Sequence, residues 1–201
     1  MLRRSAPRQG DMERILIVGL GNPGKKYART RHNVGTDAIE VLAKRLGVSL
    51  KVGRDRAQIA ETRINGHAVV LAIPTTYMND SGEAVGPLAR RYKIEDPANI
   101  IVVHDELDLE PGILRIKVGG GLAGHNGLKS ISSHLHTDDY VRVRIGVGKP
   151  SSKDAGVDHV LSSIPAAERR ILDVAVEVAV DSIESIISVG IAAAMQDFNG
   201  R

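Results

Sequence analysis

Short apolar runs of strand type alternate along this chain with segments that have the apolar spacing of helices, and this alternation restricts the fold more than any other feature. The strand-like runs span residues 14–21, 57–64, 67–74, 99–109, 113–120 and 140–148. Helical spacing recurs around residues 38–46, 84–92, 128–135 and 165–189. Sheets built in this way have helices on their faces. We therefore predict one α/β domain over residues 14–201, with a mixed, twisted sheet flanked by helices.

The composition fits a globular protein and narrows the chemistry. Apolar residues make up 42% of the 201 residues and charged residues 25%, which is enough to build a core. The chain has no cysteine, which excludes disulfides, thiolate metal sites and a cysteine nucleophile. Residues 1–13 carry Arg3, Arg4 and Arg8 but no apolar stretch of the signal-peptide kind, and no run approaches the length of a membrane span. We predict a flexible basic tail over residues 1–13 and a cytoplasmic protein with no membrane partner.

The charge balance suits a polyanionic partner. The formal net charge is +3, and the sequence pI is about 9.3. Only four tyrosines and one phenylalanine are present, which argues against a surface that stacks many bases. Any nucleic acid should therefore be held mainly through its phosphates.

Gly19-Leu20-Gly21-Asn22-Pro23-Gly24 matches the glycine pattern of dinucleotide-binding loops and directly follows an apolar run. In those loops the glycines lead straight into a helix whose amides hold pyrophosphate. Here Pro23 has no N–H to offer, and helical spacing begins only near residue 36. We interpret the glycines as a sharp turn that presents Asn22 at the end of a strand.

Polar residues follow several of the predicted strands. Asn22, Asn79, Asp105 and Asn126 all lie where a strand or a glycine-rich loop ends, and ligands of open α/β sheets bind at such ends. Each has a simpler alternative: Asn79 and Asn126 as helix N-caps, Asp105 as a turn residue, and His32 as a buried structural histidine. Their joint placement at such junctions favours a site.

A histidine, a carboxylate and several amides can form a hydrolytic site without a metal or a covalent nucleophile. His32 can accept a proton from water near neutral pH, and Asp105 can fix its tautomer and orientation. Asparagine amides can donate to a developing oxyanion and bind peptide-like groups. The bond cleaved should then be an activated one, such as an ester.

Two rival chemistries lack their motifs. Possible metal ligands occur together in His104-Asp105-Glu106 and in His134-x-His136. However, adjacent residues of a strand point to opposite faces, and no H-E-x-x-H spacing occurs. We predict no metal, and we interpret His125, His134, His136 and His159 as surface or cap residues. A serine triad lacks its G-x-S-x-G turn.

Four longer stretches, taken together, resemble bacterial-type peptidyl-tRNA hydrolase over about residues 14–190. They are "LIVGLGNPGKKYARTRHNVG", "PTTYMNDSGEAV", "VVHDELDLEPGILRIKVGGGLAGHNGLKSI" and "YVRVRIGVGKP". The resemblance implies an enzyme that cleaves the ester between a peptide and the 3′ end of tRNA, recycling tRNA during translation. It also implies that no cofactor is needed, that the partner is peptidyl-tRNA and that the protein is a monomer. A catalytically silent RNA-binding module is the alternative.

The resemblance also assigns roles to residues. His32 matches the catalytic base, Asp105 its orienting carboxylate, and Asn22 an asparagine that favours N-blocked over free aminoacyl groups. Further matches are Tyr27, Tyr77, Asn79 and Asn126 in the substrate groove, and Lys117 and Arg144 near the tRNA 5′-phosphate. Strand alternation would place Arg115 with Lys117 and Arg142 with Arg144, so that four cations could form one patch.

The chain departs from the family pattern at several positions. Leu122 stands where a polar residue is more common and Ala123 where glycine is, so the backbone of the glycine-rich loop is in question, because alanine tolerates positive φ poorly. Thr36 stands where an aromatic residue is common, which would thin the packing under His32. None of these changes removes a predicted catalytic residue.

Overall fold

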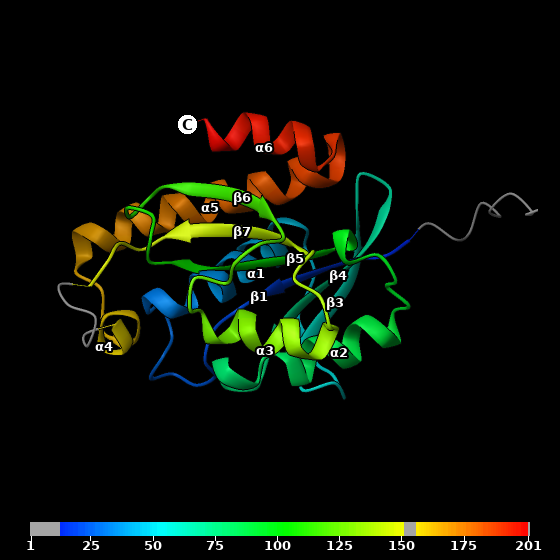
Figure 1. Cartoon of the computed structure of the whole chain (residues 1–201), viewed down its shortest axis with the longest axis horizontal. Helices are drawn as coiled ribbons and strands as arrows, with labels where there is room; N and C mark the ends of the chain where they lie inside the picture. Colours follow the sequence, from blue (N-terminus) through cyan, green and yellow to red (C-terminus); the bar gives the residue numbers. More distant parts are fainter. Residues whose placement is uncertain (1–12, 151–155, 201) are drawn as a thin grey trace, which may run out of the picture.

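The computed structural model describes residues 13–150 and 156–200 as one α/β domain, which confirms the predicted fold class (Figure 1). Its seven-stranded sheet has the order β2-β3-β4-β1-β5-β7-β6. The strands are β1 (Ile15–Gly19), β2 (Lys51–Val52), β3 (Ala57–Ile64), β4 (His67–Pro74), β5 (Ile100–Glu106), β6 (Leu114–Val118) and β7 (Val141–Gly146). The sheet is mixed, because β4, β1, β5 and β7 run parallel while β2, β3 and β6 pair antiparallel with their neighbours.

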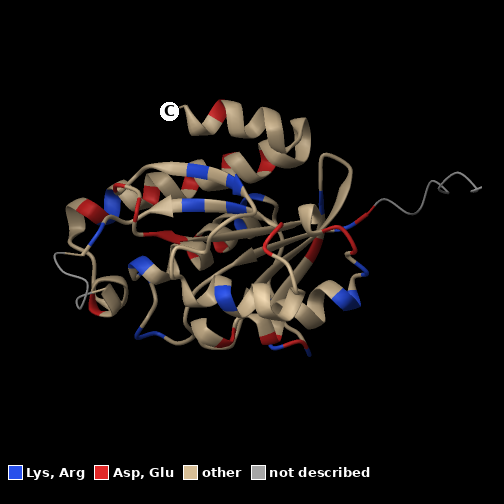
Figure 2. Ribbon diagram, in the orientation of Figure 1, with Lys and Arg blue, Asp and Glu red and all other residues tan. Residues whose placement is uncertain are grey.

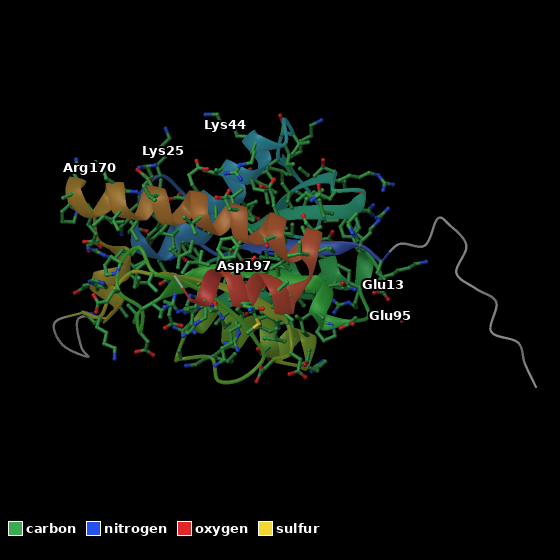
Figure 3. The ribbon with its side chains drawn as sticks, turned by 90° about the horizontal axis from the view of Figure 1, so that it is seen from above. Glu13, Lys25, Lys44, Glu95, Arg170 and Asp197 are labelled. Carbon is green, nitrogen blue, oxygen red and sulfur yellow. The ribbon has the colours of Figure 1, made fainter. Side chains whose placement is uncertain are left out.

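Helices cover both faces of the sheet. They are α1 (Val34–Arg45), α2 (Gly82–Arg91), α3 (Asn126–Leu135), α4 (Gly156–Leu161), α5 (Ala166–Val189) and α6 (Ile191–Asn199). In Figure 1, α5 and α6 lie on the side of the sheet opposite α2 and α3. The view from above in Figure 3 shows α5 and α6 lying across one side of the molecule, with Lys44 and Arg170 at its rim. No described helix is long and apolar enough to cross a membrane.

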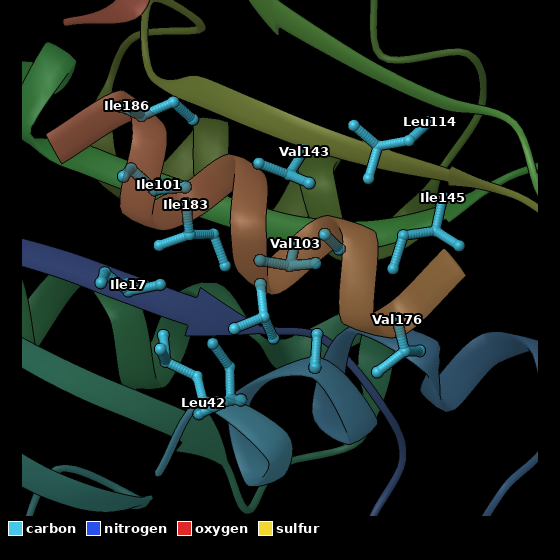
Figure 4. Packing of buried hydrophobic residues seen from close by; sticks show 14 of the residues in the cluster. Ile17, Leu42, Ile101, Val103, Leu114, Val143, Ile145, Val176, Ile183 and Ile186 are labelled. Atoms are coloured by element: carbon cyan, nitrogen blue, oxygen red, sulfur yellow. The ribbon is translucent and has the colours of Figure 1, made fainter. Parts of the chain in front are cut away.

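Each face of the sheet has its own apolar core. One core joins strand residues such as Ile17, Val103 and Val143 to Leu42 of α1 and Ile183 of α5 (Figure 4). The other lies under α2 and α3. The inner strand β5 is buried along its whole length, which is why it reads as a continuous apolar run before its polar end.

The sequence patterns located all but the shortest strand, whereas two helices were not predicted. The stretch "KPSSKDAG" at residues 149–156 is polar and turn-prone, which predicts a mobile surface segment. Most of it, like residues 1–12 of the predicted tail, lies outside the described residues, and Gly156 begins α4. Helix α6 follows Gly190, whose φ of 89° interrupts the helical chain after α5.

Gly19, the last residue of β1, and Gly35 in the first turn of α1 allow the strand and the helix to pack closely. A Cβ on Gly19 would lie 2.2 Å from the carbonyl oxygen of Gly35, and one on Gly35 would lie 2.3 Å from that of Val103. The chain then forms turns and a 3-10 helix, η1 (Arg31–Asn33), before α1 begins. The turn therefore brings η1 to the carboxyl ends of β1 and β5, which is where a ligand site is expected.

Candidate active site

A pocket of about 510 Å³ lies at the carboxyl ends of the central strands. Six of the predicted site residues line it: Asn22, His32, Tyr77, Asn79, Asp105 and Asn126. Tyr27 is not part of this lining, but its ring packs edge-on against Tyr77 with centroids 6.3 Å apart. Tyr77 is 58% exposed, so this pair forms an aromatic rim beside the pocket.

His32 and Asp105 form the predicted pair. Nδ1 of His32 lies 2.9 Å from Oδ1 and 3.0 Å from Oδ2 of Asp105, at the end of β5. The Asp105 side chain is buried, while 15% of the His32 side chain is exposed. Since the carboxylate only accepts, Nδ1 of His32 donates, and neutral His32 keeps its lone pair on Nε2. This is the tautomer that a general base needs.

His125 is a second imidazole on the same carboxylate, and the sequence interpretation of it as a surface or cap residue was incomplete. Its Nε2 lies 3.0 Å from Oδ1 of Asp105, and its Nδ1 accepts a hydrogen bond of 3.3 Å from the Leu128 N–H, capping α3. The cap fixes the tautomer, so Nε2 donates to Asp105. The only sequence signal was its position before Asn126, at the end of the glycine-rich loop.

The electrostatics of the pair favour an ionised carboxylate. Burial by itself would raise the pKa of Asp105, but His32 and His125 outweigh burial and hold that pKa well below its usual range. The neighbouring His104 is fully buried, and burial together with His125 lowers its pKa to about 3. Its Nδ1 donates to the Asp105 carbonyl over 2.7 Å, so His104 is a neutral structural residue.

The same three groups have the spacing of a metal site, but their protons argue against one. His32, Asp105 and His125 each bring one possible ligand atom to within 4.8 Å of the others. Nδ1 of His32 and Nε2 of His125, the nitrogens that face Asp105, both carry hydrogens. If Nε2 of His125 lost its hydrogen to bind a metal, Nδ1 of neutral His125 would carry one instead and could no longer accept from the Leu128 N–H that caps α3. The arrangement fits a hydrogen-bonded acid–base array better than a metal centre.

Asn33 orients Asn22, a role that sequence reasoning missed. Oδ1 of Asn33 accepts from the Asn22 N–H, and Nδ2 of Asn33 donates to the Asn22 carbonyl, both over 2.9 Å. Oδ1 of Asn22 in turn accepts from the Met78 N–H over 2.8 Å. The amide of Asn22 is therefore oriented, and its Nδ2 is left as the donor for a carbonyl or an oxyanion.

The alternative of two helix N-caps is wrong. Ser81 precedes α2, while Asn79 lies in the 3-10 helix η2 (Met78–Asp80). His125 caps α3, and Asn126 is the first residue of that helix. The side chains of both asparagines are thus not committed to capping, and both residues are exposed at the pocket.

Two of the three departures from the family pattern, at Ala123 and Thr36, lie close to this site. Ala123 lines the pocket with φ of 49°, a left-handed conformation that costs alanine about 1 kcal/mol relative to glycine. The Thr36 hydroxyl oxygen is buried and has no hydrogen-bond partner among the described residues. The backbone strain at Ala123 therefore lies directly at the pocket.

The predicted four-cation patch is wrong for Arg142. The register confirms one shared face, since Arg115 pairs with Arg144 and Lys117 with Arg142 (Figure 2). Arg142, however, is only 2% exposed, and its guanidinium donates to the carbonyls of the glycine-rich loop, over 2.9 Å to Gly121, over 2.8 Å to Gly120, and also to Gly119. The Arg142 guanidinium therefore holds the glycine-rich loop and is not part of an exposed patch.

Lys117 and Arg144 are accessible in part and lie outside the pocket lining. Nε of Arg144 donates over 3.0 Å to Glu106, a pocket residue whose carboxylate is buried. Both cations are half-buried on the same face of β6 and β7. Part of each cation is therefore accessible on this face of the sheet.

The comparisons with known proteins agree with one another. Residues 16–201 match the family model described as Peptidyl-tRNA hydrolase. The chain is 47% identical over 180 residues to the peptidyl-tRNA hydrolase of Mycolicibacterium gilvum (strain PYR-GCK), covering 89% of this chain and 93% of that protein. It is 51% identical over 176 residues to that of Frankia alni, covering 88% and 89%. A crystal structure of peptidyl-tRNA hydrolase from Acinetobacter baumannii superposes with a TM-score of 0.88 at 41% identity, covering 94% of this chain and 95% of that one.

Proposed function

The chain belongs to the peptidyl-tRNA hydrolase family, and from this premise we propose how its residues carry out the hydrolysis of peptidyl-tRNA. His32 takes a proton from water through Nε2, and the resulting hydroxide equivalent attacks the ester carbonyl between the peptide and the 3′ ribose of tRNA. Asp105 stabilises the imidazolium that forms. As the tetrahedral intermediate breaks its bond to the 3′ oxygen of the ribose, the imidazolium returns the proton to that oxygen, which releases the free tRNA and the peptide acid. The observation that carries this proposal is the contact between Nδ1 of His32 and the ionised Asp105 at the base of the pocket.

The three asparagines hold the reacting end of the substrate in this proposal. Nδ2 of Asn22 donates to the carbonyl of an N-blocked residue, while Asn79 and Asn126 contact the ester and the peptide. The rim formed by Tyr27 and Tyr77 contacts the extended chain. The enzyme would work as a cytoplasmic monomer, and no step needs a cofactor.

The assay that tests the function measures the release of free tRNA from N-acetyl-aminoacyl-tRNA in EDTA, with no added nucleotide. The hydrolase releases tRNA under these conditions, whereas a catalytically silent RNA-binding module leaves the ester intact. The His32–Asp105 pair favours the hydrolase. Binding without any release would contradict the proposal.

In the same assay, the Asn22→Ala variant should lose its preference for N-acetyl-aminoacyl-tRNA over free aminoacyl-tRNA by about 10- to 100-fold, because one hydrogen bond to a blocked carbonyl disappears. The Asn22→Asp variant is a matched control that keeps one hydrogen bond and removes the other. Its carboxylate can still accept from the Met78 N–H, but it has no N–H to donate to the substrate. It should show the same loss. A preserved preference in both variants would move the selectivity to Asn79 or Asn126.

Lys117 and Arg144 would hold a terminal phosphate of the tRNA. Neutralising either residue should raise KM with little change in kcat and reduce the salt slope of binding by about 1 per charge removed. The substitution Lys129→Ala, at an exposed site on α3, is the control. If neither KM nor the salt slope changes, the phosphate contact lies elsewhere, with Arg3, Arg4 and Arg8 as the next candidates.

A further inference from the structure

Helix α4 forms one wall of the pocket, and hydrogen bonds from Nε2 of its His159 to the carbonyls of Val147 (3.2 Å) and Gly148 (3.1 Å) tie it to the segment after β7. It contributes Val157, Val160 and Leu161 to the lining, so this wall is apolar. A helix of six residues is too short to be stable alone, so tertiary contacts must fix its position. Among the described elements its main contact is η1, the turn that carries His32.

Arg31 makes that contact specific. It directly precedes His32, is only 6% exposed, and donates through Nε and Nη2 to the two carboxylate oxygens of Glu168, at 2.7 Å each. Its Nη1 donates over 3.0 Å to the carbonyl of His159, in the middle of α4. One planar guanidinium therefore joins η1, α4 and the first turn of α5.

We infer that Arg31 is a positioning residue that holds the apolar wall of α4 against the turn carrying the catalytic base. This inference rests on the proposed function and deepens it, because it assigns the apolar wall to the peptide part of the substrate. Loss of the contact with His159 would let α4 move relative to His32, and binding of the peptide would weaken. The chemistry at His32 would change little, because Asp105 holds the imidazole independently.

The substitution Arg31→Lys separates the effect of positioning from the effect of charge. The Arg31→Lys variant keeps the cation and can pair with Glu168, but an ammonium on a flexible stem cannot reproduce the fork that reaches both Glu168 and His159. Arg45 offers a matched control, since it also joins α1 to α5 through ion pairs with Glu177, Asp181 and Glu184, away from the pocket. The Arg45→Lys variant makes the same chemical change there.

We expect Arg31→Lys to raise KM for a peptidyl-tRNA carrying an apolar N-acetyl-dipeptide by about 10-fold, with kcat within about 3-fold of the wild type. The salt slope of binding should not change, because no phosphate contact is lost. Hydrogen exchange of residues 156–161 should accelerate. The Arg45→Lys variant should leave all three measurements unchanged.

A second variant removes the ion pair without leaving a buried charge. In Arg31→Met/Glu168→Met both charges are absent, so thermal stability should stay near that of the wild type. KM should nevertheless rise as in Arg31→Lys, because the His159 carbonyl has lost its hydrogen bond to the side chain at position 31, which ties α4 to η1. A wild-type KM in both variants would overturn the inference. This outcome differs from failure of the proposed function, in which His32→Ala would retain turnover.

Discussion

The His32→Ala variant should lose about 10²- to 10⁴-fold in kcat while binding tRNA almost as the wild type does. Alanine leaves no group to take the proton of water, whereas Lys117, Arg144 and the pocket walls are unchanged. The measurement is single-turnover release of tRNA from N-acetyl-aminoacyl-tRNA, together with a direct binding titration.

His134 provides the matched control for this substitution. It is an exposed histidine of α3, and its Nδ1 faces the carbonyl of Ser130, outside the pocket lining. The His134→Ala variant should turn over at the wild-type rate. Near-normal turnover of His32→Ala itself would remove His32 from the mechanism, whatever its place in the pocket.

The Asp105→Asn variant should lose about 10²-fold in kcat, less than His32→Ala, because part of the water activation survives. Asp105 accepts from both His32 and His125, and an amide offers one oxygen and one NH₂ in place of two accepting oxygens. Oδ1 contacts both imidazoles, whereas Oδ2 contacts only Nδ1 of His32, so an NH₂ in place of Oδ2 faces His32 and favours a ring that turns an acceptor toward it. His125 is held by the Leu128 N–H, so His32 is the one that shifts its proton to Nε2 and loses its basic atom.

The pH profile of kcat supplies a second measurement for Asp105. Removing the carboxylate takes away the charge that stabilises an imidazolium, so the profile of Asp105→Asn should shift. The Asp108→Asn variant is the control, since the exposed carboxylate of Asp108 pairs with Lys149 at the surface. Full activity with an unshifted profile in Asp105→Asn would make Asp105 a purely structural residue.

One physical rule explains why predicted site residues from separate segments line the same pocket. Asn22 and Asp105 directly follow apolar runs, and the carboxyl ends of neighbouring parallel strands meet at one edge of a sheet. His32 lies between a glycine turn and the first helix, which restricts it to the same edge. Local patterns were thus enough to predict the fold class and to bring these residues to one pocket.

Other positions needed the tertiary structure because their roles depend on partners that are distant in sequence. Arg142 has the same strand alternation as Arg144, yet it is buried under the carbonyls of a loop that lies 21 to 23 residues earlier in the chain. Arg31 meets Glu168 across 137 residues. No periodicity distinguishes a solvated cation from one that folding surrounds with acceptors.

The sequence by itself determined the alternation of strands and helices, the polar ends of β1 and β5, and the residue types that can activate water and bind an ester. Only the tertiary structure decided which hydrogen-bond partners these residues find. It placed His125 on the carboxylate of Asp105, Asn33 on the backbone of Asn22, and Arg31 between α4 and α5. The physical reason is that apolar patterning encodes burial one element at a time, whereas the orientation of a side chain is set by donors and acceptors that meet only when the elements pack.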